Sequence, residues 1–471
     1  MSRLLRRFFS SYHTRLFGCG FNGHYQLFLN DNINRNVFTA SDAILFSDRE
    51  ERIKMIDAGE KHAFVLTNKG RLFGIGCNDV GQVGVGNVTS FLVNIPEGST
   101  SKQMMEKVTS STHIDIDHIL NPPGTTERDY ITVVACGRDF SFIATKQGKL
   151  YSCGSNLYGN LGLDLRTKNK TYFTRVNFPK HAKIANISCG AYHTIILTED
   201  HHIYGMGLNI FGQLGFNPKE MEKRIQQENY FQSKGEQLDF SYVSKPIRVD
   251  CFDHLAYEGD YIAEVATGAC HTVFLTKSGK VYVCGLNIHG EIGLGKDVRC
   301  SYTPVNPIFL HPMPYMDDIP VVKWISAGLD HTILVTESGE AYACGKNEDG
   351  QLGLGDYKNR YEFNMIEKFE QKNIRVLQAT CGMSHTYFTT TSLDGSSKQD
   401  FYATGCNTFG NLGLGHFYTV NEPKLLSGVA KAKEGIRWQV FCSSHSNTTY
   451  LVQIKEKSLL KRIRDSLFMG A

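Results

Sequence analysis

Histidine is the residue type whose regular recurrence in this sequence most suggests a metal-binding or catalytic role. Of 17 His, six recur in a short motif that reads Gly-x-x-His, then apolar residues, then Thr. The six are His62, His193, His271, His331, His385 and His445, and Cys442 replaces the Gly of the last copy. Imidazoles bind a metal when several of them converge. Because these six belong to six separate copies of a repeat, we interpret them as structural, each bonded to backbone inside its own unit.

Cysteine and glycine offer two further motifs that the repeat explains. The 13 Cys contain no Cys-x-x-Cys pair, so a zinc site is not indicated. Gly18-x-Gly20-x-x-Gly23 matches the dinucleotide fingerprint, but no helix-forming stretch follows it. No Ser–His–acid set or paired-carboxylate site emerges from the repeats. We therefore expect no cofactor, no metal and no catalytic residue for bond-making chemistry.

A second motif lies downstream of the histidine and reads Gly-x-Asn, followed by Gly-(Gln/Asn/Glu)-(Leu/Ile)-Gly. It begins at Gly76, Gly154, Gly207, Gly285, Gly345 and Gly405, with a weaker copy at Gly20. From His62 to Gly76 the spacing is 14 residues, and four other copies repeat it, including one in which Phe140 holds the histidine position. The residues between read as a β-branched strand, a turn and a second strand.

Hairpins that recur at roughly 50–60 residues cannot bury their faces alone and must pack against one another. The chain opens with the glycine half of a unit near Gly20 and closes with the histidine half near His445. Seven units are complete only if the two ends share one, which also removes an open sheet edge. We predict an all-β, seven-bladed β-propeller over residues 16–453, closed by sharing one blade between the chain ends.

Together the two motifs resemble the regulator of chromosome condensation repeat family. The resemblance covers residues 16–453 and implies a seven-bladed propeller. The departures are Phe140, the weak first turn where Phe28 replaces the closing Gly, and insertions at 87–130 and 216–261. Family members include exchange factors for small GTPases, subunits attached to ubiquitin ligases, a plant light sensor and organellar assembly factors, so the fold does not fix the function. With Trp324 and Trp438 as its two tryptophans, the chain lacks a light sensor's tryptophan cluster.

Residues 1–15 are predicted to be a mitochondrial transit peptide. Arg3, Arg6 and Arg7 share one helical face beside apolar residues, and the first acidic residue is Asp31. Arg7-Phe8-Phe9 fits a processing site, so we expect cleavage near Phe9. The alternative is a short basic tail on a cytosolic or nuclear protein. Within the resemblance, the mitochondrial type of member is then the nearest.

The segments outside the repeat supply the candidate partner contacts. The 216–261 insertion holds a charged stretch that includes Lys223 and Arg224, and we expect a helix there. The tail at 454–471 places an apolar helical face among cations such as Lys461 and Arg462, which suits a membrane surface or RNA, or packing against the propeller. Long loops carry function or are tolerated insertions.

Charge narrows the classes of partner. A net charge of +3 and the lack of a long apolar stretch indicate no DNA partner and at most peripheral membrane contact. The leading hypothesis is a mitochondrial interaction propeller, in the matrix or at the inner membrane, that serves as guanine-nucleotide exchange factor for a small or dynamin-like GTPase. Asp139 and Asp330, one residue before the histidine position, are candidates for its exchange face.

Two alternatives stay open from the sequence. One is a non-catalytic assembly subunit of the mitochondrial ribosome or RNA machinery, with ribosome factors or RNA as partners. The other is a cytoplasmic or nuclear Ran-type exchange factor or adaptor.

Overall fold

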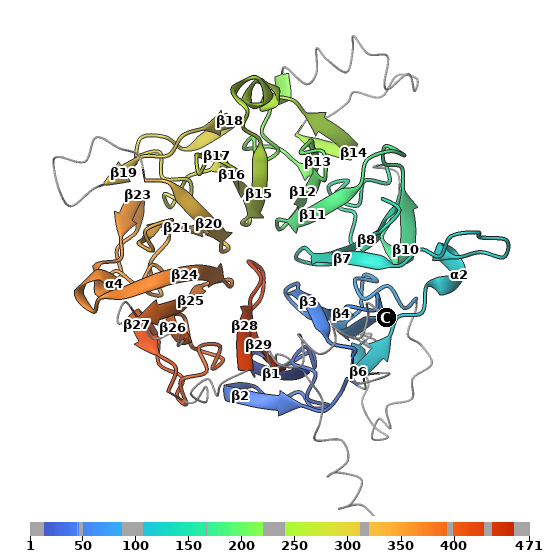
Figure 1. Ribbon diagram of the computed structural model, residues 1–471, viewed down its shortest axis with the longest axis horizontal. Helices are drawn as coiled ribbons and strands as arrows, with labels where there is room; N and C mark the ends of the chain where they lie inside the picture. The colour runs from blue at the N-terminus through green and yellow to red at the C-terminus, as the bar shows by residue number, and fades with distance from the viewer. Residues whose placement is uncertain are drawn as a thin grey trace, which may run out of the picture.

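The computed structural model describes residues 14–44, 46, 50–86, 107–164, 167–219, 241–310, 320–392, 399–427 and 436–455. These residues form seven sheets arranged as a ring (Figure 1). Each sheet runs from an inner strand near the ring axis to an outer strand at the periphery (Figure 1). The seven-bladed propeller predicted from the repeats is confirmed.

Blades 1 to 3 follow one another along the chain. Blade 1 comprises β3 (Ile53–Ala58), β4 (His62–Thr67), β5 (Leu72–Cys77) and β6 (Lys107–His113). Blade 2 comprises β7 (Ile131–Cys136), β8 (Phe140–Thr145), β9 (Leu150–Gly154) and β10 (Lys170–Val176). Blade 3 comprises β11 (Ile184–Cys189), β12 (His193–Thr198), β13 (Ile203–Leu208) and β14 (Tyr242–Val249).

Blades 4 to 6 repeat this order. Blade 4 comprises β15 (Ile262–Thr267), β16 (His271–Thr276), β17 (Val281–Leu286) and β18 (Cys300–Val305). Blade 5 comprises β20 (Val322–Ala327), β21 (His331–Thr336), β22 (Ala341–Gly345) and β23 (Arg360–Met365), with the short β19 (Phe309–Leu310) parallel to β23. Blade 6 comprises β24 (Ile374–Cys381), β25 (His385–Ser392), β26 (Gln399–Gly405) and β27 (Val420–Leu425).

Blade 7 is built from both ends of the chain, as predicted. It comprises β28 (Ile436–Phe441), β29 (Thr448–Lys455), β1 (Thr14–Gly20) and β2 (Arg35–Ser41). The strands β1 and β29 pair in antiparallel register from Thr14 opposite Ile454 to Gly20 opposite Thr448. This pairing closes the ring, so neither end of the repeat array leaves an unpaired edge.

The hairpin of each repeat is fixed by local contacts. His62 lies opposite Gly76 in the register of β4 and β5. Gly76 adopts a φ of +116°, and a Cβ there would stand 2.4 Å from the Lys61 carbonyl oxygen, so only glycine fits. In the turn that follows, the Asn78 side chain accepts a hydrogen bond from the Val83 N–H at 2.9 Å. The turn asparagine makes the same bond in all seven blades.

The apolar core is divided among the junctions between neighbouring blades. Phe64 of blade 1 packs with Ile143 and Phe173 of blade 2. Tyr387 of blade 6 packs with Trp438 and Leu451 of blade 7. No single blade buries its own faces, which is why the ring needs all seven.

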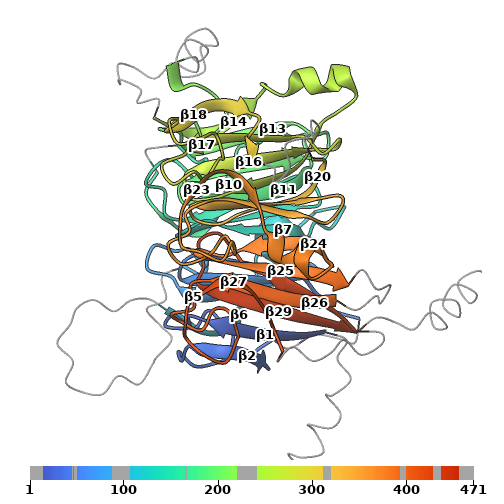
Figure 2. The ribbon, with the colours of Figure 1, turned by 90° about the vertical axis from the view of Figure 1, so that its left-hand side faces the viewer.

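The ring has two faces from which the connecting loops emerge (Figure 2). The turn face carries the loops between the first and second strands of each blade and the asparagine turns after the third strand. The opposite face carries the hairpins between second and third strands and the links to the next blade. Its short helices are α2 (Asp117–Leu120), η2 (Asp253–Glu258) and α4 (Glu367–Gln371). Within the described residues, no helix is long and apolar enough to span a membrane.

The two insertions are narrower than the sequence suggested. Residues 107–113 of the expected 87–130 insertion form β6, and residues 242–249 of the expected 216–261 insertion form β14, so both stretches are outer strands. A peripheral strand packs on one side only, so the sequences of the outer strands vary most between repeats. Because of this variation, the repeat pattern did not reveal β6 and β14. The parts at 87–106 and 220–240 lie outside the described residues. The propeller also extends slightly beyond the predicted range 16–453, since β1 begins at Thr14 and β29 ends at Lys455.

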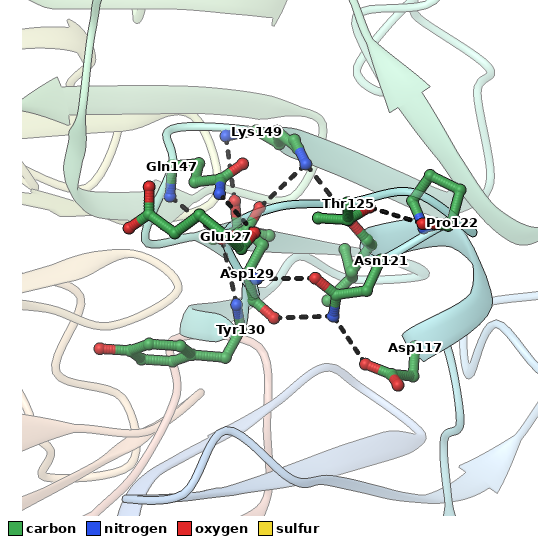
Figure 3. A network of polar contacts seen from close by, with 11 residues as sticks. Asp117, Asn121, Pro122, Thr125, Glu127, Asp129, Tyr130, Gln147 and Lys149 are labelled. Atoms are coloured by element: carbon green, nitrogen blue, oxygen red, sulfur yellow. Dashed lines mark hydrogen bonds and ion pairs between the residues drawn. The ribbon is translucent and has the colours of Figure 1, made fainter.

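The rest of the 87–130 segment is held tightly to blade 2 (Figure 3). Asn121 accepts a hydrogen bond from the Asp129 N–H at 2.7 Å and donates to the Asp117 carboxylate at 2.7 Å. The fully buried Asp129 side chain pairs with Lys149 at 3.3 Å. Residues 114–130 are therefore an ordered link between blades 1 and 2 on the opposite face.

Candidate protein-binding face

Five of the repeat histidines lie at the junctions between blades, near the turn face. Each donates or accepts a hydrogen bond through Nε2 with a hydroxyl of the next blade. The pairs are His62–Ser141, His193–Thr272, His271–Thr332, His331–Thr386 and His385–Thr449, at 2.8–3.0 Å. The expectation that each imidazole bonds backbone within its own blade is therefore wrong. The histidine instead ties one blade to the next, a contact that the spacing within a repeat cannot reveal.

Burial sets the charge of these five histidines. It lowers the pKa of each to about 3, so the rings are neutral near pH 7. In the part of the chain that the structure describes, no three His, Cys, Asp or Glu side chains gather as a metal site would require. Their geometry is that of inter-blade links.

Blades 2 and 7 depart from this pattern. In blade 2, Phe140 takes the histidine position opposite Gly154 and makes no such bond. In blade 7, Thr448 lies opposite Gly20 and so occupies that position, which the sequence analysis assigned to His445. Phe441, the last residue of β28, lies opposite Tyr450 as Ala135 lies opposite Phe142 in blade 2, so Cys442 corresponds to Cys136 and not to the loop glycine. The loop after Cys442 is therefore two residues longer than Gly-x-x-His. Sequence reasoning matched the histidine and missed the insertion, because only pairing with β1 fixes the register.

His445 lies in this longer loop, which turns toward the centre of the ring after β28 (Figure 1). Its ring is 2% exposed, close to the Cys189 backbone, and neither ring nitrogen has a hydrogen-bond partner among the described residues. Burial lowers the pKa of His445 to about 4, and the nearby Arg138 also lowers it. The ring centre is thus partly filled by a neutral side chain of the closing blade.

A chain of backbone hydrogen bonds holds the first loops of neighbouring blades together on the turn face. It runs from Ala191 N–H to Ala269 O, Ala269 N–H to Leu329 O, Leu329 N–H to Met383 O and Met383 N–H to Ser446 O, at 2.8–3.2 Å, and Glu60 N–H bonds Arg138 O at 3.0 Å. These bonds use main-chain atoms, so the side chains at the same positions are free to differ between blades. A rigid rim with variable side chains suits recognition.

One candidate carboxylate, Asp139, belongs to a charged cluster between blades 1 and 2. Arg138 Nε contacts Glu60 Oε2 at 2.6 Å, and its Nη1 donates to the Tyr192 hydroxyl at 2.5 Å. Asp139 Oδ2 lies 3.7 Å from Arg138 Nε. Burial raises the pKa of Asp139, and the charge of Glu60 adds to this. The sequence analysis missed Arg138, Glu60 and Tyr192; aligning the repeat copies would have shown that they occupy the two variable positions before the histidine.

The other candidate, Asp330, lies three blades away on the same rim. Burial raises its pKa, while the neighbouring His289 and Lys346 favour the charged form. Lys346 is itself paired with Glu348 at 3.2 Å. The structure therefore places Asp139 and Asp330 on one face but in separate clusters. The partner-contact candidates Lys223, Arg224, Lys461 and Arg462 lie outside the described residues.

A sequence profile of the RCC1-like domain matches residues 15–448 of this chain. The chain belongs to the RCC1-like domain family. The ultraviolet-B receptor UVR8 of Arabidopsis thaliana is 29% identical over 317 residues, which cover 67% of this chain and 58% of the receptor. The guanine nucleotide exchange factor SRM1 of Saccharomyces cerevisiae is 27% identical over 262 residues, covering 54% of this chain and 49% of that factor. The matched regions thus span less than two thirds of either relative.

The fold is shared with solved structures of the family. Prp20p of Saccharomyces cerevisiae, whose structure was described together with its binding to Gsp1p and histones, superposes with a TM-score of 0.69. The match covers 98% of this chain and 96% of Prp20p at 17% identity, which shows a common fold.

Proposed function

We propose that this chain binds a small GTPase on its turn face and accelerates release of the bound guanine nucleotide. The yeast comparisons support the proposal: SRM1 is a guanine nucleotide exchange factor, and the Prp20p structure was described together with its binding to Gsp1p. The observation that carries it is the placement of Asp139 and Asp330 on a rim whose backbone is fixed from blade to blade.

Exchange breaks no covalent bond, so the propeller needs no nucleophile. A GTPase holds its nucleotide through a lysine and a magnesium ion at the phosphates. A carboxylate presented by a rigid neighbour competes for those positive groups and weakens their hold. Rigidity matters because a rim already in position loses little entropy when it binds. Burial raises the pKa of Asp139 and of Asp330, so both side chains become fully charged only at a pH above the range in which carboxylic acids ordinarily ionise.

Nucleotide release from purified organellar GTPases loaded with fluorescent GDP tests the proposal. We expect the wild-type chain to accelerate release from one of them. Asp139→Asn and Asp330→Asn should each reduce that acceleration by about tenfold, the effect of losing roughly 1.4 kcal/mol of binding to the activated state. Glu337→Gln, an exposed change on the opposite face, is the control and should leave the rate unchanged.

If the chain accelerated nucleotide release from none of the GTPases, the exchange mechanism would be rejected. If the chain then co-sedimented with mitochondrial ribosomal particles, the non-catalytic assembly subunit would become the better account.

The mitochondrial location is part of the proposal and is supported by the basic, acid-free residues 1–15. Residues 1–13 lie outside the described part of the chain. Replacing Arg3, Arg6 and Arg7 by Glu reverses the charge on which the inner-membrane potential acts. The variant should remain in the cytosol, and the wild-type amino terminus should be cut near Phe9. Normal import of the variant would reject the mitochondrial location. Accumulation of the wild-type chain in the nucleus would favour the Ran-type exchange factor.

A further inference from the structure

At two junctions between blades, the turn face carries a pair of side chains in contact. Each pair joins the second residue after the turn asparagine of one blade to the residue before the histidine position of the next. At the junction of blades 2 and 3 these are Tyr158 and Tyr192, whose rings meet edge to face at 4.9 Å. At the junction of blades 5 and 6 they are Asp349 and Ser384, which share a hydrogen bond. The repeat geometry thus creates matched sites whose chemistry differs from junction to junction.

Between these pairs the first residue after each turn asparagine points outward. In blades 2, 3 and 4 it is Leu157, Ile210 and Ile288, which are 69%, 44% and 55% exposed. In blades 1 and 5 the same exposed position holds Asp79 and Glu348. The turn accepts polar and apolar residues alike at this position, although Asp79 accepts a hydrogen bond from Gln82 Nε2 at 2.9 Å. Apolar side chains on three successive blades therefore need another explanation.

The junctions inside this stretch are also neutral and largely aromatic. Tyr158 and Tyr192 lie at one junction, and the corresponding positions at the next junction are Phe211 and Cys270. Burial raises the pKa of the Cys270 thiol to about 12, so it stays neutral. We name the set Leu157, Tyr158, Ile210, Phe211 and Ile288 the apolar arc.

Charge distinguishes the two ends of the apolar arc. At the blade 5 end, Asp330, Glu348 and Asp349 stand against Lys346, which leaves an excess of negative charge beside His289. At the blade 2 end, Arg138 and Lys61 are balanced by two carboxylates: Glu60, at 2.6 and 3.7 Å from them, and Asp139, at 3.7 Å from Arg138. One end is thus acidic, and the other is a cluster of charges already paired.

We propose that the apolar arc docks a protein partner that presents an apolar ridge ending in basic side chains, with the basic end against blade 5. Anionic lipids and nucleic acids are disfavoured, because the acidic end repels phosphate. A second copy of the chain is disfavoured too, because its Lys61 and Arg138 are already engaged with Glu60. Exposed aromatic and aliphatic anchors beside a charged edge are the usual composition of a binding hot spot. This inference rests on the proposed function in taking the turn face as the partner face.

A photo-crosslinking amino acid placed at single sites of the full chain tests the docking surface. The sites are position 157, position 288 and, as control, position 321 on the opposite face, where Val321 is 50% exposed. The chains are irradiated in extracts of the cells that express them, and each crosslinked protein is identified by mass and purified. We expect one protein to crosslink from positions 157 and 288 and not from 321.

Binding of that purified protein then measures the contribution of each group. Leu157→Ser combined with Ile288→Ser should weaken binding by about tenfold or more, while Val321→Ser should not. Glu348→Lys should weaken it further and should reduce its dependence on salt, because the acidic end no longer attracts the basic one.

Each outcome separates the docking inference from the exchange mechanism. A crosslinked partner that is not a GTPase leaves the apolar arc intact and rejects exchange. Crosslinks only to a second copy of the chain, to RNA or to lipid, equal crosslinking from position 321, or no crosslink at all would overturn the inference. Normal binding by the doubly substituted chain would overturn it as well.

Discussion

The junction histidines and His445 are equally buried, yet they differ in whether they link two blades. His331 uses Nε2 to reach Thr386 of the next blade at 3.0 Å, while both nitrogens of His445 are without a partner in the described structure. The first arises from the repeat, where each of the five copies meets a hydroxyl 55–79 residues away in sequence. The second arises from a two-residue insertion that the repeat does not govern. A recurring residue therefore stabilises the ring only where its partner in the neighbouring blade recurs with it.

The shared blade is the feature whose loss should have the largest effect. Deleting residues 1–20 removes β1, which pairs along its whole length with β29 and connects it to β2. We expect the chain to lose cooperative unfolding and to aggregate, because blade 7 would expose unpaired edges to its neighbours. Deleting residues 1–13 leaves β1 in place and is the control. Thermal unfolding followed by circular dichroism distinguishes the two, and equal curves would mean that closure contributes nothing.

The next largest effect should come from pH acting on the junction histidines. The pKa of His331 is about 3 in the folded chain and about 6.5 unfolded, so unfolding takes up a proton as pH falls between those values. The histidine therefore contributes stability above pH 6.5 that is lost toward pH 3. In His331→Ala the stability should decline less steeply over that range, by up to about 1.4 kcal/mol per pH unit. Urea midpoints from pH 4 to 8 measure this, and parallel curves for the two proteins would contradict it.

Removing a junction histidine at neutral pH should cost less than the loss of closure. His271→Ala or His331→Ala breaks a buried inter-blade hydrogen bond and leaves a cavity, while the Thr332 and Thr386 hydroxyls still donate to backbone carbonyls, so we expect a loss of about 1–3 kcal/mol. Chemical denaturation gives the value. A double-mutant cycle of His331→Ala with Thr386→Val isolates the pair, and an interaction energy near zero would show that the contact contributes little.

The smallest effect should follow from His445→Ala. Its ring makes no hydrogen bond within the described residues, so its removal costs only packing, and we expect less than about 1 kcal/mol. The same denaturation experiment measures it. A loss as large as that of His331→Ala would mean that His445 has a partner and that the two histidines are alike after all.

The hairpins, their number and the closing of the ring could all be predicted from the amino-acid sequence. The hairpins depend on contacts between residues at most 20 positions apart, such as the bond from Val83 N–H to Asn78 and the pairing of His385 with Gly405, which spacing records directly. The order of the two motifs along the chain sufficed to show that the ends share a blade. Asp139 and Asp330 lie one residue before the histidine position, which the same spacing also records.

The contacts that cross from one blade to the next became visible in the folded structure. It gave each junction histidine a hydroxyl partner in the neighbouring blade, put Thr448 in place of His445, and joined Arg138 to Glu60 and Tyr192. It also assigned β6 and β14 to stretches that the sequence treated as insertions. The physical reason is that these contacts join residues far apart in sequence, and the packing of sheets around a ring, rather than any local period, brings them together.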